Sequence, residues 1–256
     1  NKEYQYLGKN ADKVNFINEN KYQKIDFENF KLFHTSGVKI NFDQENRVLD
    51  IKQTTAGSRV FLFDGKIQNM TINFTGVQSA HDETPYFPID IKALTGCLTL
   101  INLQIKNISI TSDKSSCEDS INFINVQGEV DNILIKNSFM DGLDIDFSNV
   151  QINKAEIYGA KNDCLDFSNG HYKLNQILVS NCGDKGLSIG EKSFLESDKI
   201  NINNSDIGVA SKDSSITSLN TISLENIRTC VAAYNKKQEY YGSFIKIKEM
   251  NCRNYD

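Results

Sequence analysis

The sequence predicts an all-β fold, a right-handed parallel β-helix solenoid with about 22 residues per coil and an N-terminal cap. Apolar residues recur in columns at a fixed spacing of 22 residues, as expected when each coil stacks on the last. Along each segment of the chain that contributes to these columns, apolar and other residues alternate with the two-residue period of a strand with one buried face. Asn, Ser and Gly are frequent between the segments, which suits tight turns.

The first strand of each coil carries the clearest repeat. One inward column is Ile121, Leu143, Leu165, Leu187, Val209 and Val231. A second inward column is Phe123, Ile145, Phe167, Ile189, Ser211 and Ala233. The positions between these columns should point outward, and they are Asn122, Asp144, Asp166, Ser188, Ala210 and Ala232.

Two further strands complete each coil. The second recurs at Ile133/Ile135, Ala155/Ile157, Ile177/Val179, Ile200/Ile202, Ile222/Leu224 and Ile245/Ile247. The spacing slips by about one residue near Lys199, which is interpreted as a small bulge in a loop. The third strand is predicted at Val150/Ile152 and Tyr172/Leu174, and stacked turn residues such as Asn137, Asn181 and Asn203 are expected to form amide ladders. A β-sandwich is the alternative, but sandwiches do not repeat columns at one spacing.

Earlier in the chain the spacing is looser. Strands are expected at Val38–Phe42, Val48–Ile51, Val60–Phe63 and Met70–Phe74, in the first coils. Residues 1–35 are interpreted as an N-terminal cap, or a linker from a larger protein, and 36–256 as the β-helix domain. A cap would cover the open end of the solenoid and its strand edge. Because the chain does not begin with Met, we expect it to be part of a larger multidomain chain.

Composition narrows the partners. The net charge of −5 argues against nucleic acid, which usually needs a basic surface. No run approaches the ~20 apolar residues of a membrane helix, so membrane insertion is not expected. The three histidines do not share a column, and each is expected at the surface or in a loop. The loop Gln78–Pro88 is interpreted as an insertion.

The six cysteines leave the disulfide state open. Cys230 and Cys252 are 22 residues apart, so we expect them at one register of adjacent coils and within disulfide reach. Cys97 and Cys117 flank one loop and are a second candidate pair. Cys164 and Cys182 do not share a column.

Charge accumulates at one register of the first strand, and this predicts the site. Carboxylates act as general acids or bases, and lysines neutralise a substrate carboxylate. The catalytic candidates are Asp144, Asp166, Lys185 and Lys212. The substrate-binding candidates are Asn122, Ser188, Glu191, Asp213, Tyr234, Lys236 and Lys237. The alternative is a charge ladder that only keeps the solenoid soluble.

Stacked carboxylates repel one another, which raises the pKa of one or recruits a cation. A calcium ion needs several oxygen ligands, and it is predicted at Asp141, Asp144, Asp163 and Asp166. Asp141 and Asp163 have a second interpretation, in which they are turn residues that accept hydrogen bonds.

Five aligned segments carry a family resemblance: MDGLDIDFS, NDCLDFS, NCGDKGLSIGE, DIGVASKDSS and AAYNKKQE. Over roughly residues 95–250 the chain resembles right-handed parallel β-helix proteins of the pectate-lyase-like superfamily, and more closely β-helix modules of bacterial surface and envelope proteins, often without an assigned activity. The resemblance implies an extracellular or cell-envelope location and a polysaccharide partner.

The superfamily's polygalacturonases combine stacked aspartates with a His and an Arg-Ile-Lys motif. This chain has the aspartates but neither the matching His nor the Arg-Ile-Lys motif. The superfamily's chondroitinase-B and alginate-type lyases use a basic pair beside Ca²⁺, for which Lys185 and Lys212 are the counterparts here. The resemblance therefore implies a polysaccharide lyase or epimerase acting on a uronic-acid polymer. The alternative is a non-catalytic carbohydrate-binding or structural domain of a larger bacterial surface protein.

Overall fold

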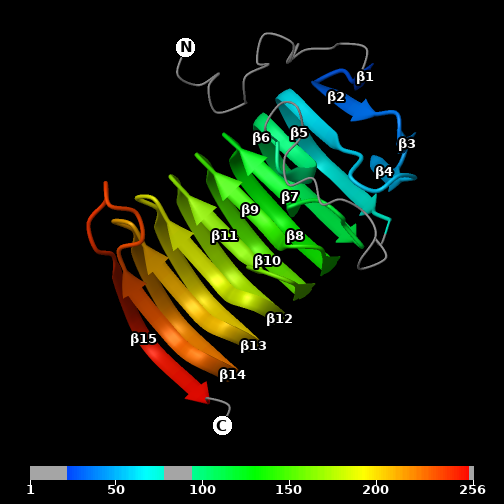
Figure 1. The fold of residues 1–256 in the computed structure, drawn as a ribbon. Helices are drawn as coiled ribbons and strands as arrows, with labels where there is room; N and C mark the ends of the chain where they lie inside the picture. Colours follow the sequence, from blue (N-terminus) through cyan, green and yellow to red (C-terminus); the bar gives the residue numbers. More distant parts are fainter. Residues whose placement is uncertain (1–21, 78–93, 254–256) are drawn as a thin grey trace, which may run out of the picture.

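The computed structural model describes residues 22–77 and 94–253, which form a β-solenoid of about 8 turns (Figure 1). The described residues contain no helix, and their strands join in one 15-stranded sheet. The strands are β1 (Tyr22–Asp26), β2 (Phe30–Thr35), β3 (Val38–Asp43), β4 (Val48–Gln53), β5 (Val60–Thr75), β6 (Gly96–Asp113), β7 (Asp119–Ile124), β8 (Gln127–Ser138), β9 (Asp141–Asp146), β10 (Asn149–Ala160), β11 (Leu165–Ser168), β12 (His171–Gly190), β13 (Phe194–Lys212), β14 (Ile216–Tyr234) and β15 (Phe244–Arg253).

The predicted register is confirmed along the first strand of each coil. Leu165 pairs in parallel with Leu143 on one side and Leu187 on the other, and the row continues through Val209 to Val231. Leu143, Leu165, Leu187 and Val209 are wholly buried. Burial of such aliphatic side chains is worth roughly 1.5–3 kcal/mol each, so this row is a main source of stability.

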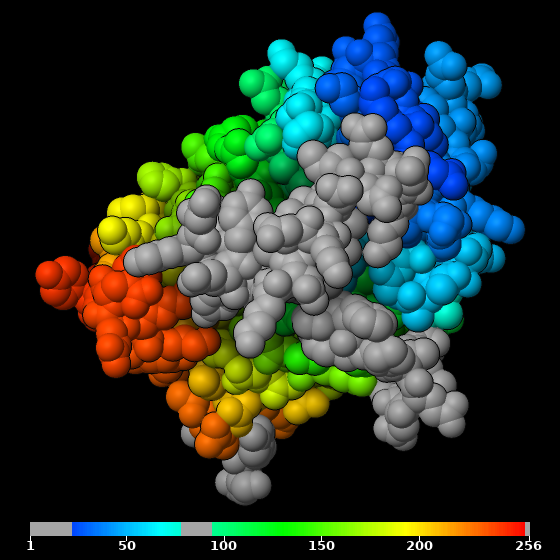
Figure 2. Space-filling view, turned by 45° about the horizontal axis from the view of Figure 1, so that its top comes forward, coloured from blue at the N-terminus to red at the C-terminus, as the bar shows by residue number. Residues whose placement is uncertain are grey.

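Successive coils stack along one axis, with the first strands at one end of the molecule and β14 and β15 at the other (Figures 1 and 2). All pairings from β5 onward are parallel. The early strands are in part antiparallel. The β1–β2 hairpin pairs with β5 through β2, and β3 pairs with β4 before β4 joins β5 in parallel.

The strands expected at Val38–Phe42, Val48–Ile51, Val60–Phe63 and Met70–Phe74 are confirmed as β3, β4 and the two ends of β5. Of the predicted cap, residues 1–21 lie outside the described residues, and so does the whole of the predicted insertion Gln78–Pro88 with His81. The boundary at residue 35 stays a prediction.

Two details of the predicted register are wrong. Ile245 and Ile247 pair with Thr217 and Leu219, so they continue the third strand and not the second. The turn between β14 and β15 is long, and it shifts the last coil away from the 22-residue spacing. The extra residue that was placed near Lys199 lies in the turn after Gly190, because Ser168 pairs with Gly190 but His171 with Phe194.

Asparagines in the left-handed backbone conformation turn the corners. Asn137, Asn181, Asn204 and Asn226 have φ between 55° and 63° at one corner. Asn tolerates this conformation better than most residues because its short side chain bonds locally. Asn204 donates to Asn181 at 2.8 Å, which forms the predicted kind of ladder. Asn203, the residue named for it, is offset by one position and accepts from Asn226.

Three disulfides link neighbouring coils at one corner. Their Cα–Cα distances are 5.3 Å for Cys97–Cys117, 5.4 Å for Cys164–Cys182 and 6.3 Å for Cys230–Cys252. The first cysteine of each pair stands directly before an inward residue of the repeat, Leu98, Leu165 or Val231. The second lies in the next coil, on the other side of the corner.

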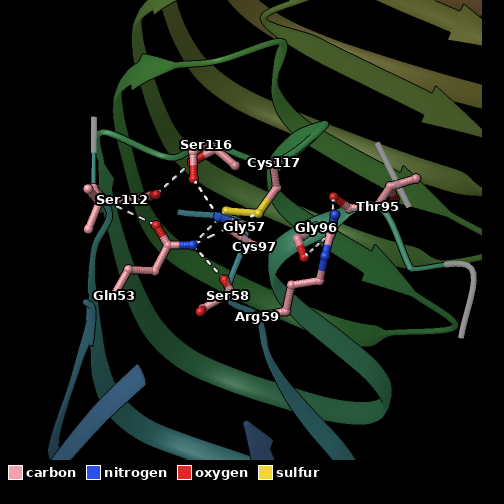
Figure 3. Close-up of a disulfide and its surroundings, with 12 residues drawn as sticks. Gln53, Gly57, Ser58, Arg59, Thr95, Gly96, Cys97, Ser112, Ser116 and Cys117 are labelled. Carbon is pink, nitrogen blue, oxygen red and sulfur yellow. Dashed lines mark hydrogen bonds between the residues drawn. A yellow bond between two sulfur atoms is a disulfide. The ribbon is translucent and has the colours of Figure 1, made fainter. Parts of the chain in front are cut away.

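Cys230 and Cys252 lie within disulfide reach as expected and are bonded, although Cys252 pairs with Leu224 and is not at the register of Cys230. The candidate pair Cys97 and Cys117, whose state the sequence left open, is also bonded. The Cys164–Cys182 bond was not predicted. Around the first bond, the buried Gln53 amide donates to Ser58 O at 2.5 Å and lies 3.3 Å from Cys97 Sγ (Figure 3). Arg59 donates to the carbonyls of Thr95 and Gly96 beside it.

Replacing Leu165 by Ala should destabilise the protein by roughly 2–5 kcal/mol, because it leaves a cavity inside a closed row. The matched control is Leu178→Ala on β12. Leu178 is 37% exposed, so this substitution should change stability by less than about 0.5 kcal/mol. Thermal unfolding followed by circular dichroism measures both. Equal melting temperatures for the two variants would contradict the assigned core.

Candidate functional site

The outward column of the first strand is assembled as predicted. Asn122, Asp144, Asp166 and Ser188 are direct neighbours on β7, β9, β11 and β12. Asn122 and Ser188 are wholly buried although they point away from the core, and Asp144 and Asp166 are half-buried. Adjacent parallel strands lie about 4.8 Å apart, so the two aspartates stack closely.

A second row of charge lies three residues before the first. Asp119 pairs with Asp141, and Asp163 and Lys185 follow in the next coils. Two of these aspartates accept a backbone N–H from the next coil: Asp141 Oδ1 accepts the Asp163 N–H at 2.7 Å, and Asp163 Oδ1 accepts the Lys185 N–H at 3.0 Å. This agrees with the hydrogen-bonding interpretation of Asp141 and Asp163, except that the bonds join coils instead of closing a turn.

Lys185 ends this row as a charged partner. Its Nζ lies 3.4 Å from Asp163 Oδ1 and also bonds Asp184, a residue that the sequence analysis did not single out. Burial lowers the pKa of Lys185, but Asp163 and Asp184 outweigh burial and the net shift is upward. The arrangement suits charge neutralisation better than proton abstraction by Lys185.

Asp144 and Asp146 form a carboxyl pair on β9. Burial, then the charges of Asp119 and Asp146, raise the pKa of Asp144 well above its ordinary value. Burial also raises the pKa of Asp146, while hydrogen bonds from Asn122 and Asp144 lower it. Asn122 additionally donates to Asp144 Oδ2 at 2.9 Å. The pKa values of both carboxyls are therefore raised, and at Asp146 the hydrogen bonds oppose the effect of burial.

Asp166 has a different environment. Burial raises its pKa to about 6, while the charge of Lys212 acts in the opposite direction. Lys212 is 5% exposed, and its Nζ donates to Ser188 Oγ at 2.6 Å. Gly190 lies beneath this side chain, since a Cβ there would sit 3.5 Å from Lys212 Cε. The lysine thus reaches back over Gly190 to the outward column.

The long turn after β14 borders the site at the C-terminal end (Figure 1). Asp213 is wholly buried, and its Oδ1 accepts the backbone N–H groups of Lys236 and Lys237, both at 2.7 Å. Lys237 forms an ion pair with Glu191, which also accepts from Ser168. Tyr234 pairs with Lys212 at the base of the turn.

The structure therefore brings together Asn122, Asp144, Asp166, Ser188 and Lys212, with Lys185 in the parallel row. Asp213, Glu191, Lys236 and Lys237 act at the border, where Asp213 and Glu191 hold the turn in place. Asp119 and Asp146 are further members that the sequence analysis left outside the candidate set. The sequence contained a signal for both residues. Asp119 stands at the repeat position of Asp141, and Asp146 stands at the repeat position of Ser168.

The four aspartates predicted to bind calcium do not fit that ion well. Oxygens of Asp141 and Asp163 accept backbone hydrogen bonds, and a raised pKa favours the neutral carboxyl of Asp144. Over residues 22–77 and 94–253, no three His, Cys, Asp or Glu side chains are grouped to hold a metal. Calcium binding stays a prediction, and no step proposed below uses it.

The sequence matches no known family model, no curated protein and no solved structure. Within the described ranges, no helix has the length and apolar character needed to cross a membrane. The class defined by fold and site is therefore a parallel β-solenoid with a partly protonated carboxyl face.

Asp141→Asn should raise stability at pH 8 and flatten its pH dependence. Burial and Asp163 raise the pKa of Asp141 to about 7, above the ordinary 3.8, so the folded protein retains a proton that the unfolded chain releases. This contribution is fully present below about pH 4 and is lost as the pH rises through 7. Asn keeps an Oδ1 acceptor for Asp163 and Asn162, the two donors that bond it.

Melting temperatures at pH 5 and pH 8 measure this effect. The control is Asp206→Asn, because the hydrogen bond from Arg228 lowers the pKa of Asp206 and its titration lies below this window. A wild-type protein that melts higher at pH 8 than at pH 5, with Asp141→Asn behaving identically, would refute the assignment.

Proposed function

We propose that this chain acts on a uronic-acid-containing polysaccharide as a lyase or epimerase, with the carboxyl face as its active site. The observation that carries the proposal is the pair Asp144 and Asp166, which occupy one column with unlike raised pKa values. Burial and neighbouring carboxylates raise the pKa of Asp144 well above its ordinary value, and burial raises the pKa of Asp166 to about 6. Two titratable groups whose environments separate their pKa values are the usual mark of an acid and a base.

In this mechanism Asp166 removes the proton at C5 of a uronate. In a lyase the C4–O bond then breaks, a C4=C5 double bond forms, and the departing oxygen takes the proton of Asp144. In an epimerase Asp166 keeps the proton that it has removed, and Asp144 donates a different proton to the opposite face of C5. A general base works best when its pKa lies near the working pH, and Asp166 meets this condition.

In this proposal Lys212 neutralises the carboxylate of the substrate. Removing the C5 proton becomes easier when the adjacent carboxylate is neutralised, and the ammonium of Lys212 lies buried between Ser188 and Asp166. Buried ammonium groups interact more strongly with a bound anion than exposed ones do. Lys185, held by Asp163 and Asp184, adds positive charge one row away.

Glycosidic hydrolysis is the second candidate, and the carboxyl pair itself favours it. Hydrolases use one protonated and one ionised carboxyl on either side of the scissile bond. Asp144 and Asp166 offer the same combination. The two reactions share the residues and differ in the product.

The resemblance to pectate-lyase-like proteins supports a polysaccharide substrate, a location outside the cell or in its envelope, and a place in a larger surface protein. These three points are part of the proposal.

Incubation with alginate, polygalacturonate and hyaluronan, with neutral xylan alongside, tests the function. Absorbance of unsaturated products reports a lyase, reducing ends without unsaturation report a hydrolase, and NMR of the C5 configuration reports an epimerase. Asp166→Asn should lower the rate at least about 100-fold by removing the base. Asp198→Asn, an exposed outward aspartate that accepts from Asn220 on another face, should keep full activity.

Silence in all three readouts would reject the enzymatic proposal. Retention of the protein by the same polymers without turnover would then support a non-catalytic carbohydrate-binding domain.

A further inference from the structure

A surface hollow of about 370 Å³ lies beside the carboxyl face, at the corner that follows the first strand. Its volume is within the roughly 300–1,000 Å³ of small-molecule sites. The lining residues come from four successive coils and are Gln127, Phe147, Ser148, Asn149, Asn169, Gly170, His171 and Lys192. A second hollow of about 240 Å³ is lined in part by the same residues, Asn149 and His171, so the two hollows are neighbours.

Phe147 is the unusual residue of this corner. Its φ is 50°, in the left-handed region where a bulky residue is strained. The neighbouring coils place Asn125 and Asn169 at the same position, with φ of 54° and 50°. The Phe147 side chain is also 60% exposed, so no packing gain in the core offsets the strain. An exposed aromatic ring in a strained backbone position is typical of a ligand-binding surface.

Gly170, which lines the hollow, lets the chain pack closely beneath it. A Cβ at this position would lie 2.2 Å from Tyr172 Oη and 2.3 Å from Ser148 O, so a larger residue does not fit there. Tyr172 is fixed by hydrogen bonds to Ile145 O and Ser168 O, so it does not give way. The backbone of this corner is therefore held in a fixed position by the packing beneath it.

The lining matches the chemistry of a charged sugar. A pyranose ring has apolar C–H faces, which pack on an aromatic ring, and a rim of hydroxyls, which pair with side-chain amides. Phe147 offers the ring, and Gln127, Asn149 and Asn169 offer amides. Lys192 is exposed at the edge of the hollow, with its Nζ 5.7 Å from the Tyr240 ring centroid. Its positive charge complements a sugar carboxylate.

We propose that this hollow is a subsite for one uronic acid residue of the polysaccharide, which stacks on Phe147 and places its carboxylate at Lys192. The proposal rests on the proposed function and deepens it. Phe147 directly follows Asp146, and its N–H donates to Ser168 O at 3.0 Å. A chain bound in the hollow thus continues onto the carboxyl face within one or two residues.

Phe147→Asn tests the subsite without damage to the fold, because Asn is the residue that the adjacent coils use at this corner. Binding is measured by affinity electrophoresis through gels containing alginate, polygalacturonate, hyaluronan or xylan. We expect the dissociation constant of Phe147→Asn for the acidic polymer bound by wild type to rise at least fivefold, with an unchanged or higher melting temperature. Leu178→Asn, another exposed apolar side chain on a different face, should bind as wild type.

Lys192→Gln provides the second arm. It should weaken binding of the acidic polymers, reduce the dependence of that binding on salt, and leave any retention by neutral xylan unchanged.

The outcomes separate the two proposals. Wild-type binding by Phe147→Asn and Lys192→Gln overturns the subsite, even if Asp166→Asn abolishes turnover. Binding that both variants weaken, with no turnover by wild type, supports the subsite and rejects the enzyme. A wild-type protein that none of the four polymers retards overturns the subsite.

Discussion

The in-register parallel ladder between coils is the constraint on which the rest of this structure depends. Because each residue pairs with the one that precedes it by one coil, every position along the coil becomes a column of stacked residues. One crowded column lies directly before the inward residues of the first strand and is occupied by Cys97, Ser120, Gly142, Cys164, Gly186, Gly208 and Cys230. A Cβ on Gly186 would meet two methyl groups of Ile202 at 2.7 Å, so this corner accepts only small side chains.

The same ladder creates the carboxyl face. A sequence that repeats aspartate at one position of the coil must stack the carboxyls at the strand spacing, where like charges are unfavourable. The protein accommodates them in two ways. In one row the carboxyl oxygens accept N–H groups from the next coil, as Asp141 and Asp163 do. In both rows burial and mutual repulsion also raise the pKa, as for Asp141 and Asp144, which favours the neutral carboxyl.

Sequence periodicity predicted the columns well because a fixed spacing leaves one possible register. It failed where the spacing changes, as in the last coil, where Ile245 follows the long turn and returns to the third strand. The Cys164–Cys182 bond was missed because it crosses a corner, and residues that meet there are not equivalent in the repeat. The sequence predicted that stacking raises the pKa of a carboxylate, but not that burial is the largest cause for Asp144. Phe147 could have been noticed from the periodicity, because it is a phenylalanine in a column of corner asparagines.

The uniform length of the coils has a consequence for how the chain folds. Sheet proteins usually fold slowly, because strands distant in sequence must meet before any contact is rewarded. Here most ladder partners from β7 to β14 are only 22 or 23 residues apart, and each disulfide closes a loop of 18 to 22 residues. The entropy lost in closing a loop is therefore nearly the same for every coil. Such an array can nucleate in its middle and grow toward both ends, one coil at a time.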